Sequence, residues 1–167
     1  MKENFNSSPN GGEQINIMAY ISLLYHIVFR PKNSASVIPI EKEEMLYRYI
    51  WGIVKHKNGV LYRIGGMPDH VHILVQLPAT IAVADFVRDL KTATNVYLKE
   101  NRDSFPKFDG WSRSYCALTY SQNEKDTIIN YIKSQKEHHK RVSFRDELLG
   151  MLRESGVEVD MKYFMVD

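Results

Sequence analysis

The feature that most constrains the fold is the order in which strand-like and helix-like periodicities follow one another. Alternating apolar residues predict four strands, at about 20–29, 60–64, 70–77 and 114–120. Apolar residues at helical spacing predict helices at about 39–59, 80–101 and 121–140, and a short amphipathic helix from about 144. The order β-α-β-β-α-β is the ferredoxin-like, split β-α-β arrangement. We therefore expect an α+β fold with a four-stranded antiparallel sheet, two crossover helices on one face, and a C-terminal tyrosine-bearing helix.

Residues that begin and end helices refine these limits. Pro39 suits the start of the first helix, and Asn58 with the following glycine suits its end. Thr80 is a candidate cap for the second helix, and Ser121 with Glu124 matches a capping box for the third. The stretch 65–69 reads Gly-Gly-Met-Pro-Asp, which predicts the turn between the second and third strands.

Composition bounds the class of protein. A chain of 167 residues with 44% hydrophobic side chains can bury the core of one domain. The single cysteine, Cys116, excludes a disulfide framework and suits a cytoplasmic location. No apolar stretch is long enough to span a membrane. The N-terminal segment lacks the apolar region of a signal peptide.

Three segments of the chain differ in character. Residues 1–17 are polar and rich in Asn, Ser and Gly, which predicts a flexible leader. Residues 18–145 are expected to form the functional domain, and residues 146–167 a short helix with an acidic tail. That tail carries six acidic against two basic side chains, so the body holds the excess of positive charge. A basic body suits a phosphate-rich partner, but solvated helix faces produce the same pattern, and charge alone does not decide the function.

Two histidines lie on the third predicted strand. Because alternate residues of a strand share a face, His70 and His72 point away from the face on which Val71 and Ile73 meet the crossover helices. Two neighbouring imidazoles can hold one divalent metal ion. A His-x-His pair can equally be two polar residues on the wetter face of a sheet.

The third long helix supplies a tyrosine and a glutamine. Tyr131 and Gln135 are four residues apart and lie on one helix face. Alone, such a tyrosine is usually a packing residue and such a glutamine is usually solvated. This helix, however, is the remaining long element that can cover the face bearing the histidines. The combination predicts that two imidazoles, an amide oxygen and a phenol converge on a metal-bound phosphate, which a phenol can attack.

These residues fall in blocks that resemble the single-tyrosine transposases of bacterial insertion sequences, a branch of the HUH endonuclease superfamily with REP-associated tyrosine transposases among its members. The blocks are YHIVFRPK (25–32), GGMPDHVHILVQLP (65–78), YIKSQKEHHK (131–140) and FRDELL (144–149). The resemblance implies that His70, His72 and Gln135 bind Mg²⁺ or Mn²⁺. It also implies that Tyr131 is the nucleophile that cuts and rejoins single-stranded DNA, leaving a 5′-phosphotyrosine and a free 3′-hydroxyl.

The same resemblance implies the partners. The DNA would be the hairpin ends of a mobile element, and the protein a homodimer joined through its fourth strands. We expect the Tyr131 helix to dock on the histidines of the partner, with docking on its own histidines as the alternative. Candidate DNA contacts, each of which could also be ordinary surface charge or a core aromatic, are Arg30, Lys32, Arg88, Lys91, Trp111, Tyr115, Lys133, Lys140 and Arg141.

Other polar residues allow more than one interpretation. His26 is expected to be a hydrogen-bonded strand residue, and His138 and His139 to contact phosphate or compensate the helix end rather than bind metal. Asp69 either orients a histidine or belongs to the turn. Two other functions stay open, a non-catalytic or domesticated nucleic-acid-binding module and a nicking replication initiator. Initiators often carry Lys three residues after the tyrosine, where this chain has Ser134.

Overall fold

A single antiparallel sheet forms the centre of the protein in a computed structural model that describes residues 20–167. The predicted leader, residues 1–17, lies outside the described residues. The sheet has the order β2-β3-β1-β4. Its strands are β1 (Leu24–Phe29), β2 (Val60–Met67), β3 (His70–Gln76) and β4 (Cys116–Tyr120). The predicted α+β fold with a four-stranded antiparallel sheet is therefore confirmed.

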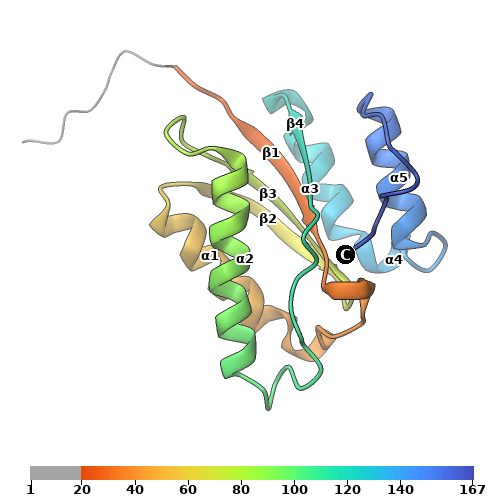
Figure 1. Ribbon diagram of the computed structural model, residues 1–167. Helices are drawn as coiled ribbons and strands as arrows, with labels where there is room; N and C mark the ends of the chain where they lie inside the picture. Colours follow the sequence, from red (N-terminus) through yellow and green to blue (C-terminus); the bar gives the residue numbers. More distant parts are fainter. Residues whose placement is uncertain (1–19) are drawn as a thin grey trace, which may run out of the picture.

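The two crossover helices cover one face of this sheet (Figure 1). They are α1 (Glu43–His56) and α2 (Val83–Glu100). The main core lies between them and the sheet, and Val71, Ile73 and Val75 of β3 point into it, as predicted. Burying this apolar surface supplies most of the driving force for folding.

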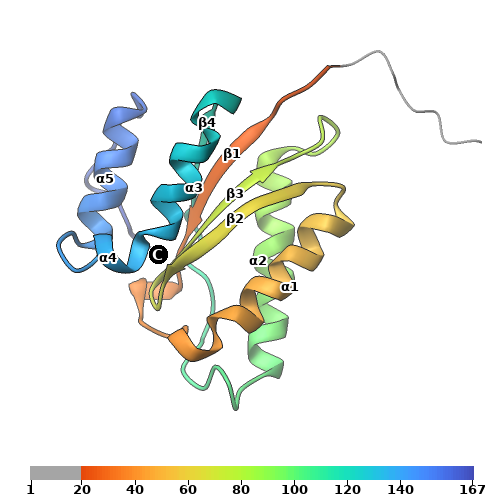
Figure 2. The same cartoon turned by 180° about the vertical axis from the view of Figure 1, so that it is seen from behind.

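The opposite face is covered by the C-terminal helices (Figure 2). These are α3 (Lys125–Lys133), α4 (Gln135–His138) and α5 (Phe144–Glu154). Leu24 and Leu74 of the sheet pack on Ile132 of α3. Val28 packs with Phe144 of α5 in a second cluster. The face of β3 that bears the histidines is therefore enclosed between two layers.

The third helix is broken where the sequence predicted one continuous helix from 121 to about 140. Its interruption lies at Ser134, whose hydroxyl donates to the Tyr131 carbonyl oxygen at 3.1 Å. A serine side chain that bonds to the backbone of its own helix competes with the helical hydrogen bonds, which accounts for the break. The capping box that precedes this helix is confirmed, because the Ser121 N–H donates to Glu124 Oε2 at 2.9 Å.

Several boundaries differ from those predicted. Strand β2 continues through both glycines to Met67, so that Pro68 and Asp69 alone make the turn. A short 3₁₀ turn separates Pro39 from α1. Helix α2 begins after Ala82 rather than at Thr80, and no side chain caps it.

The predicted division at residue 145 falls inside α5, which packs on the sheet through Phe144 and Leu148. The short amphipathic helix predicted from about residue 144 is therefore present as α5 and packs on the sheet. Within residues 20–167, no helix is both long and apolar enough to cross a membrane.

One glycine of α1 and one glycine of β2 give a paired test of this fold. A Cβ at Gly66 would overlap the His70 carbonyl oxygen and lie 3.0 Å from Val71 Cα. We expect Gly66→Ala to lower the free energy of unfolding by about 1 to 3 kcal/mol. Gly52→Ala, on an exposed helical position with no atom within 4 Å, should raise it by about 0.5 to 1 kcal/mol. Urea denaturation checks both, and a Gly66→Ala protein as stable as the wild type would contradict the close pairing of β2 and β3.

Candidate metal and nucleophile site

The structure brings together the four residues that the sequence singled out. His70 and His72 of β3 are fully buried, and Tyr131 and Gln135 reach them from α3 and α4. The Gln135 Oε1 atom lies 3.3 Å from His70 Nε2. The rings of His72 and Tyr131 have centroids 6.0 Å apart. In this chain α3 contacts both β2 and β3, and α4 contacts β2.

A carboxylate that the sequence analysis did not assign lies among these residues. Glu147 projects from α5 and is only 6% exposed. Its Oε1 atom accepts hydrogen bonds from the Tyr131 hydroxyl and, at 2.7 Å, from Gln135 Nε2. The carboxylate therefore holds the phenol and the amide side by side.

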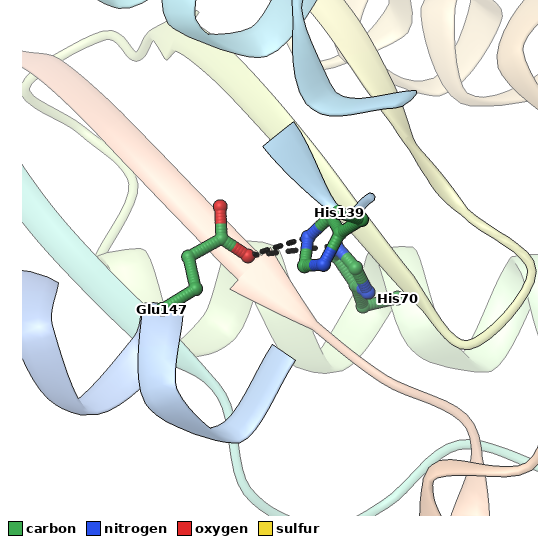
Figure 3. Close-up of side chains that lie close together, drawn as sticks. All are labelled: His70, His139 and Glu147. Carbon is green, nitrogen blue, oxygen red and sulfur yellow. Dashed lines mark ion pairs between the residues drawn. The ribbon is translucent and has the colours of Figure 1, made fainter. Parts of the chain in front are cut away.

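The second oxygen of this carboxylate faces three imidazoles. Glu147 Oε2 lies 2.8 Å from His139 Nε2, 3.7 Å from His70 Nε2 and 3.8 Å from His72 Nε2. Figure 3 shows the carboxylate directed at the rings of His139 and His70. Ligand atoms of these two histidines and Glu147 all lie within 4.8 Å of one another, which is a spacing that one metal ion can bridge.

Hydrogen bonds at Nδ1 orient the rings of His70 and His139. His70 Nδ1 bonds to Asp69 Oδ1 at 2.7 Å, and His139 Nδ1 bonds to the Val142 carbonyl oxygen at 2.9 Å. Both partners are acceptors, so Nδ1 carries the proton and, in a neutral ring, Nε2 presents a lone pair to the site. Asp69 is therefore an orienting residue as well as a turn residue.

His26 supports His72 in the same way. Its Nε2 atom is hydrogen-bonded to His72 Nδ1 at 2.9 Å, which confirms that it is a bonded strand residue. Burial lowers the pKa of His26 well below its ordinary value, and the neighbouring His72 lowers it further. Both rings are thus kept neutral in the interior.

Buried atoms without partners indicate that a cation fits this site. The buried side-chain atoms without a hydrogen-bond partner among the described residues include His72 Nε2, His139 Nε2 and Glu147 Oε2. A buried polar atom left unbonded costs free energy, and these three face one region. A divalent cation would satisfy them together, and imidazole nitrogens with carboxylate and amide oxygens are common ligands of such ions.

The charges of the site respond to burial and to one another. Burial lowers the pKa of His72 to about 4, against the opposing effect of Glu147. Burial would raise the pKa of Glu147, but the neighbouring His72 and the hydrogen bonds from Tyr131 and Gln135 outweigh it and hold that pKa below its usual value. Burial, followed by the hydrogen bond to Glu147, raises the pKa of Tyr131. Without a metal, the site therefore contains a carboxylate and a protonated phenol.

Two signals in the sequence could have revealed the residues that were missed. Glu147 lies between Phe144 and Leu148 on the apolar face of α5, where a carboxylate needs a buried partner. His139 follows Gln135 by four residues, so this C-cap residue lies on the side of α4 that bears Gln135. His139 was interpreted as a phosphate contact or helix-end charge, whereas here it faces the carboxylate.

Three of the candidate DNA contacts have structural roles. Arg30 is 3% exposed and pairs with Asp167 at 2.9 Å, so it is not a surface contact in this structure. Trp111 is a core residue that donates to Thr94 Oγ1 at 2.9 Å. The Lys91 ammonium donates to three carbonyl oxygens of residues 112–114. The exposed candidates are Lys32, Arg88, Tyr115, Lys133, Lys140 and Arg141.

Comparison with known proteins gives one consistent family. Residues 19–135 match the protein family described as "Transposase IS200 like". The chain is 30% identical over 119 residues to the ISDra2 transposase TnpA of Deinococcus radiodurans, across 69% of this chain and 85% of that relative. It is 28% identical over 120 residues to the transposase for insertion sequence element IS200 of Salmonella typhimurium, across 70% and 78%.

Solved structures agree with the fold. A crystal structure of a candidate transposase from Deinococcus radiodurans has a TM-score of 0.56 and 26% identity, and covers 77% of this chain and 98% of its own. The structure of a REP-associated tyrosine transposase bound to a REP hairpin has the same TM-score at 15% identity, and covers 74% and 73%. At that identity the second structure supports the fold alone.

The neutral, buried imidazoles predict how the metal-free protein responds to pH. An unfolded chain binds a proton at His72 near pH 6.5, but the folded protein does so only near pH 4, so stability is lost as the pH falls between these values. As the pH falls from about 7 to about 5, proton binding to His72 in the unfolded chain should lower the free energy of unfolding by about 2 kcal/mol. Proton binding to His26 should act in the same direction.

Denaturant unfolding in the presence of a chelator measures this change. The exposed His56 gives a control, because His56→Gln should follow the wild-type curve. A free energy of unfolding that stays constant over this range would contradict neutral imidazoles in the folded state.

Proposed function

Because the chain belongs to the IS200-like transposase family, we propose that it cuts and rejoins single-stranded DNA through a covalent bond to Tyr131. The observation that carries this proposal is the convergence of the Tyr131 phenol with His70, His72 and Gln135. A nucleophile beside a set of metal ligands is the arrangement that phosphoryl transfer needs. A module that only binds nucleic acid has no chemical need for it.

We infer that His70, His72 and Gln135 hold the metal ion. Their ligand atoms are two imidazole nitrogens and an amide oxygen, and the two imidazoles are fixed by Asp69 and His26. Nitrogen ligands favour Mn²⁺ over Mg²⁺, which prefers oxygen. When bound, the ion supplies charge that polarises the phosphoryl oxygens.

The reaction at Tyr131 is a transesterification. The phenolic oxygen forms a bond to phosphorus as the bond from phosphorus to the 3′ oxygen breaks. The proton lost by the phenol is balanced by the proton that the 3′ oxygen gains. The products are a 5′-phosphotyrosine and a free 3′-hydroxyl, and reversal with another 3′-hydroxyl rejoins the strands.

A surface next to the sheet offers a place for DNA. Arg88, Lys91, Trp111 and Tyr115 line one cavity of about 420 Å³ between α2 and the segment before β4. Tyr115 is 39% exposed and Arg88 is exposed, so a base and a phosphate could meet both side chains. Hairpin DNA is the bound partner of a structural neighbour, and we propose a hairpin substrate here.

A homodimer through β4 is part of this proposal. Strand β4 pairs with β1 along one edge, and among the described residues no strand pairs with its other edge. Proteins usually cover or pair such an edge. In that dimer each Tyr131 would serve the histidines of its own subunit, because α3 already packs on its own sheet. We therefore favour the cis arrangement over the trans arrangement that the resemblance suggested.

The nucleophile is tested by removing one oxygen atom. We expect Tyr131→Phe to abolish the covalent adduct with a single-stranded hairpin oligonucleotide and Mn²⁺ on a denaturing gel, while the ring continues to pack beside His72. Tyr120→Phe is the matched control. The ring centroids of Tyr120 and His26 are 6.2 Å apart, and removal of the Tyr120 hydroxyl should leave the adduct yield unchanged. An adduct of wild-type yield in Tyr131→Phe would exclude Tyr131 as the nucleophile.

Subunit mixing tests the cis arrangement. A mixture of Tyr131→Phe and His72→Ala proteins, allowed to exchange subunits, should form no adduct because every cis site carries one lesion. In a trans arrangement, one site of each heterodimer would combine an intact tyrosine with intact histidines. Adduct formation by the mixture, with neither variant active alone, would contradict the cis arrangement.

A further inference from the structure

The metal-ligand set inferred above uses no charged residue, although a carboxylate lies at its centre. We propose that Glu147 and His139 are also metal ligands, and that Glu147 joins the metal to the nucleophile by binding the ion through Oε2 and the Tyr131 hydroxyl through Oε1. This inference rests on the proposed function for the presence of a metal. Both residues lie beyond the part of the chain that matches the family, residues 19–135.

The positions of the Glu147 oxygens support this division. Oε1 is engaged by the Tyr131 hydroxyl and by Gln135 Nε2 at 2.7 Å. Oε2 has no hydrogen-bond partner among the described residues and faces the Nε2 atoms of the histidines. One oxygen therefore holds the nucleophile, and the other is free to bind a cation.

The orientation of the His139 ring suits binding of the same ion. Its Nδ1 atom donates to the Val142 carbonyl oxygen at 2.9 Å, which directs Nε2 to within 2.8 Å of Glu147 Oε2. In a neutral His139 ring both of these atoms are acceptors, so they repel each other unless a cation lies near them. The side chain of His139 is 7% exposed, and solvent offers little compensation.

Charge gives an independent argument. Glu147 is buried, and within residues 20–167 its ion-pair partners are histidines, with no Lys or Arg among them. A buried carboxylate needs a compensating charge. A divalent ion supplies that charge, and the carboxylate gives the ion its one anionic ligand in an otherwise neutral set.

The ligand role is tested by Mn²⁺ binding to the full chain without DNA. Isothermal titration calorimetry should show that Glu147→Gln weakens Mn²⁺ affinity more than about a hundredfold, which exceeds the roughly 10- to 100-fold loss typical of residues that only orient ligands. Glu154→Gln is the matched control, with the same change at an exposed position of the same helix, and should bind within about twofold of wild type.

An alternative explanation is that Glu147 and protonated His139 form a structural ion pair. In that case Glu147→Gln would bind Mn²⁺ within about twofold of wild type, and the inference would be overturned. If Glu147→Gln fails the circular dichroism check for folding, His139→Gln gives the decisive measurement, with weaker Mn²⁺ binding expected and unchanged binding contradicting the proposal.

The test of Glu147 as a metal ligand and the test of the proposed function can fail independently. A wild-type protein that forms the DNA adduct, together with a Glu147→Gln protein of undiminished Mn²⁺ affinity, would overturn the ligand role and leave the nuclease function intact. Weakened Mn²⁺ binding in Glu147→Gln, together with a wild-type protein that forms no adduct, would uphold the ligand role and overturn the function.

Discussion

The structure depends on the packing of β3 between two layers of helices. Val71 and Ile73 bury one face of the strand against α1 and α2, while His70 and His72 point to the other face. Helices α3 to α5 enclose that second face and remove the imidazoles from water. The same packing that stabilises the fold therefore creates a buried set of lone pairs beside Tyr131, and such a set is favourable only when it is hydrogen-bonded or binds a cation.

Local periodicity was sufficient to predict the sheet and the faces of β3. A strand alternates strictly, so the partition of Val71 from His70 follows from the sequence alone, and the structure agrees. Tyr131 and Gln135 also converge on the histidines as predicted. These predictions succeeded because each depends on short-range geometry and on one long-range step, the docking of α3 on the free face of the sheet.

The features that were missed depend on tertiary contacts. The break at Ser134 follows from a side-chain hydrogen bond that helix periodicity does not register. By sequence Glu147 belongs to an acidic tail, and its burial among the histidines follows only from the packing of α5 on the histidine face. Arg30 carries the charge expected of a DNA contact, but the C-terminal residue Asp167 lies beside it and forms an ion pair with its guanidinium. In each case the environment of the residue is set by a segment that lies elsewhere in the sequence.

The covalent attachment of Tyr131 to DNA is tested most directly by peptide mapping of the adduct with mass spectrometry. Trypsin cleaves after Lys125 and Lys133, and the peptide between these sites contains Tyr131 as its sole tyrosine. We predict that the nucleotide mass remains on this peptide, at Tyr131, after nuclease digestion of the bound strand. Nucleotide attached to any other residue, or an adduct peptide without Tyr131, would contradict Tyr131 as the nucleophile.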